Sequence, residues 1–371
     1  MDISNTVLLT VEDIAQSLEK LAPLSLQESY DNSGLLAGEA STVVTGILVS
    51  LDVTEAVVDE AIRRGCNLIV SHHPLIFSGL KAITGKNWVE RTLLKALRNH
   101  ICLYAMHTNL DNLASGVNAV IAEKIGLQNS RILSPKKGTL KKLVTFVPPT
   151  DVEKVRSALF EAGGGQIGLY DQASFSHSGT ATFRPLEGTN PHVGTIGELT
   201  QLPETRLEIL FESHRQAALL KALFSSHPYE EIAYDIYTLE NKQQDVGSGR
   251  LGMLPTPVQS QDFLKSLQQY FGGGLRYTAV VKEQVQKIAV CGGSGSFLLE
   301  EAIAAGADVL VTADFKYHQF LEADNRILIA DIGHFESEQF TITLLTNYLR
   351  ENFTNFATLS TETKTNPVNY L

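Results

Sequence analysis

Cysteine, basic charge and long apolar runs are all scarce in this sequence. The three cysteines, Cys66, Cys102 and Cys291, each lie in or at the end of an apolar run, which is typical of buried, reduced thiols and not of a disulfide framework. No stretch approaches the roughly 18 consecutive apolar residues of a membrane-spanning helix. The N-terminus lacks a basic segment followed by an apolar one, so we expect no signal peptide and predict a cytoplasmic protein without membrane contact.

The shortage of basic residues limits the partners of the chain. There are 30 Lys and Arg against 41 Asp and Glu, which gives a formal net charge of −11. A chain this acidic has no general electrostatic attraction to nucleic acid or anionic lipid, so we do not expect a nucleic-acid partner. The apolar fraction of 43% is ordinary for a globular protein, and a length of 371 residues predicts more than one core.

Strand-like and helix-like segments alternate in the first and last thirds. In the first third, apolar runs predict strands at 47–53, 66–71 and 101–106, with helices between them. This βαβαβ order implies a parallel sheet with right-handed crossovers. The last third repeats the plan. Strands are predicted at 287–290, 308–313 and 326–331, with a long amphipathic helix from about Glu336 to Asn352.

The middle of the chain follows another plan. A strand at 141–149 precedes a helix at 151–162, and the run RLEILFES precedes a second helix and a second strand. Strand–helix–strand occurring twice predicts a ferredoxin-like split βαβ module, with 241–250 as its exit linker. We therefore predict an α/β protein with a first α/β half at 1–137, an inserted module at 138–245 and a second α/β half at 246–371.

Histidines gather where the predicted strands end. His72 and His73 follow one strand, His107 follows the next, and His318 and His334 follow strands of the last third. Because the carboxyl ends of parallel strands form one edge where ligands bind, we expect these side chains to converge. A single histidine at a strand end is more often a hydrogen-bonded structural residue. Three strand ends that each carry histidine instead favour a shared metal site.

Carboxylates accompany two of these histidines at a spacing of four residues. Asp111 follows His107, and Glu338 follows His334 on the predicted last helix, where residues four apart share a face. Imidazole and carboxylate together suit Zn, Fe and Mn. Adjacent His72 and His73 can face two different ions, so the pattern predicts a two-metal centre.

Glycines follow the first strand of the last third in the stretch CGGSGS (291–296). Their backbone N–H groups are suited to holding an anion at a helix N-terminus. A tight strand-to-helix turn explains the same glycines equally well.

The stretches SYDNSGLLAG, SHHPLIF, HTNLD, CGGSGS, TADFKYH and GHFESE together resemble the Nif-three-like family. These are dinuclear-metal proteins whose bacterial members are often named GTP cyclohydrolase 1 type 2 homologs. The resemblance implies two divalent metal ions bound by five ligands, and it places two further histidines, His107 and His318, close to the metals. The implied ligands are His72, His73, Asp111, His334 and Glu338. Tyr30 stands where the family more often has tryptophan.

The resemblance also implies an architecture and a class of activity. Family members assemble as toroidal homohexamers with the metal sites facing an internal cavity, and longer bacterial members carry an inserted domain similar to PII and CutA proteins. We expect a metal-dependent hydrolase of a nucleotide-like or phosphoester small molecule, with His107 or His318 as general acid–base. Two alternatives stay open, namely a metal carrier or chaperone and a regulatory ring whose insert binds partners.

Overall fold

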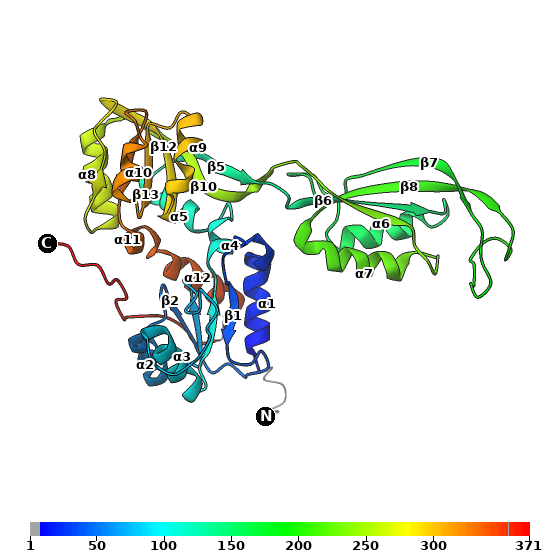
Figure 1. Ribbon diagram of the computed structural model, residues 1–371, viewed down its shortest axis with the longest axis horizontal. Coiled ribbons are helices and arrows are strands. Elements are labelled where there is room, and N and C mark those ends of the chain that lie inside the picture. The colour runs from blue at the N-terminus through cyan, green and yellow to red at the C-terminus, as the bar shows by residue number, and fades with distance from the viewer. Residues whose placement is uncertain (1–7, 355) are drawn as a thin grey trace. The chain divides into compact units, whose positions relative to one another are not determined.

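The computed structural model describes residues 8–354 and 356–371. The chain divides into two compact units, of which the larger combines residues up to Pro135 with those from Gln244 onward. The smaller unit is the intervening segment Lys136–Gln243. In Figure 1 the larger unit is therefore coloured at both ends of the scale, while the smaller unit is mostly green.

One sheet of the larger unit is built mainly from the first third of the chain. The strand order is β1-β4-β3-β2-β15. Strands β2, β3 and β4 run parallel as expected, and β15 from the C-terminal region adds a further parallel strand beside β2. All residues of the three central strands are buried, which explains their continuous apolar sequence. The bounds are β1 Gly34–Ala37, β2 Ile47–Ser50, β3 Leu68–Ser71, β4 Cys102–Ala105 and β15 Thr358–Ser360.

The second sheet of this unit has the order β11-β14-β13-β12-β10-β5. Strands β12, β13 and β14 are parallel, and β10 pairs antiparallel with β12. The expectation of a linker at 241–250 is wrong, because that stretch opens the long strand β10. A Cβ on Gly247 would lie 2.2 Å from the Ser134 carbonyl oxygen, so glycine lets β10 approach β5 closely. The bounds are β5 Gln128–Lys136, β10 Gln243–Gln259, β11 Arg276–Tyr277, β12 Gln284–Ser294, β13 Val309–Ala313 and β14 Leu328–Asp331.

Helices connect and cover these strands. Thr54 caps α2 by accepting a hydrogen bond from the Val57 amide. The long helix expected from Glu336 to Asn352 is instead two helices, with a turn at Gln339 whose side chain donates to the Phe271 carbonyl at 3.1 Å. The bounds are α1 Val11–Leu21, α2 Glu55–Arg63, α3 Trp88–Arg98, α4 Thr108–Asp111, α5 Val117–Ile125, α8 Ser260–Phe271, α9 Leu299–Ala304, α10 Tyr317–Leu321, α11 His334–Glu338 and α12 Thr341–Asn352, with 3-10 turns at Leu24–Leu26 and Ser296–Leu298.

One of the apolar clusters of the larger unit spans both of its sheets. Val70 of β3, Val311 of β13 and Leu345 of α12 belong to the same buried cluster. Helix α12 contacts β2, β15 and α5, and α5 contacts β12. The two α/β halves therefore fold as one body, which fixes the carboxyl ends of their strands relative to each other.

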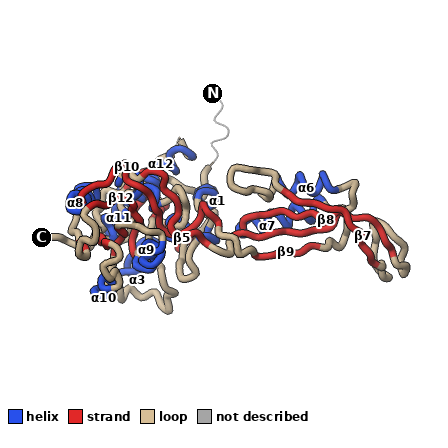
Figure 2. The backbone as a smooth tube through the Cα atoms, turned by 90° about the horizontal axis from the view of Figure 1, so that it is seen from above, coloured by secondary structure: helices blue, strands red, loops and turns tan. Residues whose placement is uncertain are grey.

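The smaller unit is a four-stranded antiparallel sheet with two helices. The strand order is β7-β8-β6-β9, and the chain order is βαββαβ, that of the ferredoxin-like module predicted for the middle third. Helices α6 and α7 share one core with the sheet, and Figure 2 shows the backbone of α6 beside the strands of this unit. The sequence did not predict β7, whose Ser- and Thr-rich residues are mostly exposed. The bounds are β6 Leu140–Val147, α6 Val152–Glu161, β7 Ser174–Phe183, β8 Thr200–Glu212, α7 Gln216–Ser226 and β9 Tyr234–Thr238, with a 3-10 turn at Ser213–Arg215.

The architecture is thus mixed α/β with several sheets. Within the described ranges, every helix is too short or too polar to cross a membrane.

Candidate metal centre

The carboxyl ends of β3 and β4 deliver three histidines to one place. The amides of His72 and His73 still donate to the Ser50 and Leu51 carbonyls, at 3.2 and 2.9 Å, so the chain stays ordered beyond the end of β3. Pro74 has no amide hydrogen with which to extend this pairing. The ring of His107 lies 5.3 Å from that of His72 and 5.5 Å from that of His73.

Helix α11 brings two further side chains to the same place from the second sheet. His334 begins the helix and Glu338 ends it, so both side chains lie on one face, and the His334 Nε2 and a Glu338 oxygen are 3.0 Å apart. The approach of Glu338 depends on a glycine in the CGGSGS stretch. A Cβ on Gly293 would lie 2.3 Å from a Glu338 oxygen.

Two N–H groups of the glycine stretch are already used within the protein. The Gly292 amide donates to the Asn118 side chain and the Gly293 amide to the Ser337 hydroxyl, both at 2.9 Å. Residues 291–294 are thus the irregular end of β12, packed against α11, and not a turn after the strand; these two groups do not form an anion site.

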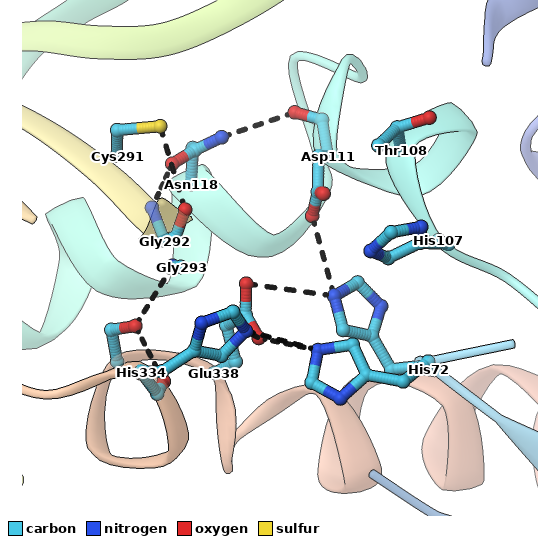
Figure 3. Close-up of polar contacts among 12 residues, drawn as sticks. His72, His107, Thr108, Asp111, Asn118, Cys291, Gly292, Gly293, His334 and Glu338 are labelled. Atoms are coloured by element: carbon cyan, nitrogen blue, oxygen red, sulfur yellow. Dashed lines mark hydrogen bonds and ion pairs between the residues drawn. The ribbon is translucent and has the colours of Figure 1, made fainter. Parts of the chain in front are cut away.

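Glu338 lies at the centre of the cluster (Figure 3). One of its oxygens is 2.9 Å from the Nε2 atom of His73, and the other is 3.7 Å from the Nε2 atom of His72. Asp111 places an oxygen 3.6 Å from the same atom of His72. Three overlapping groups arise whose ligand atoms lie within 4.8 Å of one another. They are His72 with His73 and His107, His73 with His334 and Glu338, and His72 with Asp111 and Glu338.

Each of these four histidines has an acceptor on its far side. The Nδ1 atoms of His73, His107 and His334 lie 2.7, 2.6 and 2.6 Å from carboxylate oxygens, and that of His72 lies 2.7 Å from a carbonyl oxygen. A proton on Nδ1 leaves the lone pair of Nε2 directed at the cluster, as in metal-ligating histidines. The acceptors are Met106 for His72, Asp52 for His73, Asp31 for His107 and Asp314 for His334.

Two buried atoms at the cluster lack a hydrogen-bond partner among residues 8–354 and 356–371. They are the Nε2 atom of His72 and one carboxylate oxygen of Asp111. Buried polar atoms are nearly always paired, so each such exception needs an explanation. A cation bound between the two would satisfy both atoms at once, and the side chains present therefore fit a metal ion.

The electrostatics of the cluster favour positive charge. Burial works against the charged form of His73, but the hydrogen bonds to Asp52 and Glu338 outweigh it and raise its pKa to about 9. Burial is likewise outweighed at His334, where Asp314 and Glu338 raise the pKa to about 11. For Glu338, burial is outweighed chiefly by the bond to His334, and its pKa falls well below the usual range. These shifts favour a cation, whether a proton or a metal ion.

A cavity of about 990 Å³ opens onto the cluster. Among the described residues, its walls include His107 but not His318. His318 is exposed on α10, with its ring 5.2 Å from that of Tyr317. The structure thus brings together four of the five strand-end histidines.

The sequence analysis missed two of the supporting carboxylates. Asp52 lies two residues beyond the end of β2, so the strand-edge rule applied to carboxylates would have found it. Asp31 belongs to the DNSG stretch, which carried no periodic signal. Asp314 directly follows β13, so the same rule places it at this edge of the sheet.

The fold and the cluster define the class of protein, a mixed α/β protein with a candidate His and carboxylate metal site at the meeting of two sheets. The family described as Duf34/NIF3 (NGG1p interacting factor 3) matches residues 9–367, so the chain belongs to this family. The resemblance stated from the sequence motifs is thereby confirmed.

Relatives cover most of the chain. A protein of Halalkalibacterium halodurans named GTP cyclohydrolase 1 type 2 homolog is 39% identical over 326 residues, which is 87% of this chain and 88% of the relative. A Bacillus subtilis protein of the same name is 36% identical over 97% of this chain and 98% of the relative. The crystal structure of a Bacillus cereus protein related to NIF3 superposes with a TM-score of 0.84 at 36% identity, covering 99% of this chain and all of the other.

Proposed function

We propose that this chain is a metal-dependent hydrolase that holds two divalent ions, zinc, iron or manganese. One observation carries the proposal. Three histidines, His72, His73 and His334, direct Nε2 at Glu338 while Nδ1 is held from behind, and two buried ligand atoms have no other partner within the described ranges. The ligands we assign are His72, His73, Asp111, His334 and Glu338.

The overlap of the ligand groups supports two ions and not one. Glu338 belongs to one group with His72 and Asp111 and to another with His73 and His334. A carboxylate can offer one oxygen to each of two ions, so we assign Glu338 as the shared ligand. Two such ions would supply Lewis-acid stabilisation of a developing oxyanion and an activated water, which suits hydrolysis of a nucleotide-like or phosphoester substrate.

His107 is the residue we assign to proton transfer. It lines the cavity, and its ring is oriented by the bond between Nδ1 and Asp31. That bond fixes the tautomer and leaves Nε2 free to accept a proton at the cluster. His318 also carries an acid–base assignment from the family resemblance. His318 lies on α10 and does not line the cavity, so His107 is the stronger candidate. Turnover of His107→Ala and His318→Ala, measured in parallel, would compare the two residues.

Metal analysis followed by a turnover screen tests the proposal. Protein purified without chelators should contain about two divalent ions per chain and should hydrolyse a member of a nucleotide and phosphoester panel. His107→Ala should keep the metal and lose most turnover. Metal release to an acceptor protein, without turnover on any substrate of the panel, would instead identify a metal carrier.

We also propose the assembly and the identity of the insert. The chain would form a toroidal homohexamer, and the smaller unit would be a PII/CutA-like domain. The βαββαβ order of that unit supports the second proposal. Its own apolar core, which includes Leu143 and Leu219, supports folding as a separate domain. Mass measurement in solution tests the hexamer, and a ring whose assembly depends on the insert but not on metal would favour a regulatory scaffold.

A further inference from the structure

Two large aromatic side chains line the cavity beside His107. Tyr30 is 62% exposed and Phe77 is 48% exposed. Their ring centroids are 6.3 Å apart, and the ring of Phe77 is 6.1 Å from that of His107 in an edge-on arrangement. Neighbouring exposed apolar side chains that line a cavity mark a candidate binding site.

The two loops that carry these aromatic rings are tied to each other and to the site. The Asn32 side-chain amide donates to the Ile76 carbonyl at 2.6 Å, which joins the residues following Tyr30 to the residue preceding Phe77. Asp31 accepts from the Thr108 amide at 3.0 Å and from His107 at 2.6 Å. These bonds hold the two loops that carry the rings before any ligand arrives, which lowers the entropy cost of binding.

The charges of the cavity restrict the ligand further. Seven Asp and Glu side chains line it, whereas Arg276 is the one Lys or Arg that does so among the described residues. Arg276 is already paired with Asp331. Two divalent ions would offset part of this negative charge but would leave few cations for a polyanion away from the ions.

We propose that Tyr30 and Phe77 form a binding site for a planar aromatic ring on a ligand that carries little negative charge, as the base of a nucleoside does. The inference rests on the proposed function in one respect, since the ring would bring its reacting bond to the metal cluster. It narrows the substrate to ring compounds and disfavours nucleoside triphosphates. Stacking supplies affinity at Tyr30 and Phe77, and the acidic walls select against added phosphates.

Guanosine is the first probe, with the metal-loaded full chain dialysed at a fixed free Zn²⁺ concentration. Removing a stacking aromatic costs about 1–3 kcal/mol per base, so Phe77→Ala and Tyr30→Ala should each weaken guanosine binding roughly 5- to 150-fold. Tyr30→Trp, unlike Tyr30→Ala, should bind guanosine with wild-type affinity. Phe175→Ala is the matched control, because Phe175 is 64% exposed and lies in the other unit. GTP should bind no more tightly than guanosine.

Several results would overturn the proposal. They are unchanged guanosine affinity in both alanine variants, GTP binding at least about tenfold tighter than guanosine, or no binding of guanosine, adenosine or cytidine up to about 1 mM. A changed oligomeric state without changed ring affinity would assign the aromatics to a contact between copies. Metal content is measured in the same samples to separate the two proposals. Loss of metal from His73→Ala tests the metal site. Guanosine affinity that is unaltered in Phe77→Ala and Tyr30→Ala counts against the aromatic site alone.

Discussion

Proton competition at the metal cluster gives a quantitative prediction. A histidine must be neutral at Nε2 to bind a metal ion, so each proton held there has to leave. The pKa of His73 is raised to about 9 and that of His334 to about 11. At pH 7 both imidazoles would therefore be protonated in the metal-free protein. Displacing the His73 proton alone costs about 2.7 kcal/mol, from two pH units at 1.36 kcal/mol each.

The sign of the pH dependence follows from these raised pKa values. Metal affinity should rise with pH between about 6.5 and 9, with at least two protons released per centre because the pKa of His72 is raised as well, and should rise less steeply once His73 is neutral. The unperturbed histidine pKa of about 6.5 would instead confine the competition to pH values below about 6.5. The neighbouring carboxylates thus move the window upward.

Calorimetric titration with Zn²⁺ in two buffers of different ionisation enthalpy counts the released protons directly. At least about two protons per centre at pH 7.5 agree with the structure. Release of fewer than about one proton, or a metal affinity that stays flat from pH 6.5 to 8.5, would refute the reasoning. Asp52→Asn provides a check, because loss of that carboxylate should lower the pKa of His73 and reduce the proton count.

Four further predictions concern ligation and stability. His73→Ala or Glu338→Ala should remove most bound metal, measured by elemental analysis, while circular dichroism stays unchanged. Gly293→Ala should also lower metal content, because the added Cβ would lie 2.3 Å from a Glu338 oxygen. Deletion of 138–245 should leave metal binding intact, and a soluble, metal-free product would contradict this. Glu60→Gln should lower the free energy of unfolding by about 3 kcal/mol near neutral pH in urea titrations, with little effect near pH 2.

The Glu60 prediction comes from one buried carboxylate that holds the C-terminal segment. Burial alone would raise its pKa, but bonds from Thr363, Thr361 and the Glu362 amide outweigh it and lower the pKa to about 2. A lowered folded-state pKa adds stability above the unfolded value of about 4.5, and that stability is lost as the pH falls through 2. Glu55→Gln in the first turn of the same helix is the control, because that carboxylate is 42% exposed and pairs only with Arg91 at the surface among the ion pairs of the described residues. A loss of under about 0.5 kcal/mol in Glu60→Gln would show that these bonds contribute little.

His177→Ala serves as the control for the ligand variants. His177 lies in β7 of the smaller unit and belongs to none of the three ligand groups found among the described residues. Its replacement should leave metal content unchanged. An equal loss of metal in this variant would mean that the assay reports general destabilisation and not ligation.

The parallel strands of the larger unit were predictable because their apolar runs have the composition of buried strands. Thus β3 and β13 were found close to their true bounds. Strand β7 was not, since its exposed, Ser-rich sequence carries no alternation of polar and apolar residues. Strand β15 was missed for a different reason. It has three residues, and it gains its place only by pairing with β2, about 310 positions earlier in the sequence.

Part of the site was predictable from the sequence because the strands that carry it were predictable. His72 and His107 follow neighbouring strands, so the strand-edge rule alone placed them together. The bond between Asp31 and His107 joins residues 76 positions apart across a loop, and no local pattern predicts it. The Tyr30 and Phe77 pair likewise depends on two loops meeting, which periodicity does not reveal.

Anomalous diffraction from crystals of the metal-loaded protein, recorded at the absorption edge of the bound metal, tests the central claim most directly. We predict two peaks in each chain, one between His72, Asp111 and Glu338 and one between His73, His334 and Glu338. The absence of any peak at this cluster in protein shown to contain metal would contradict the proposed centre.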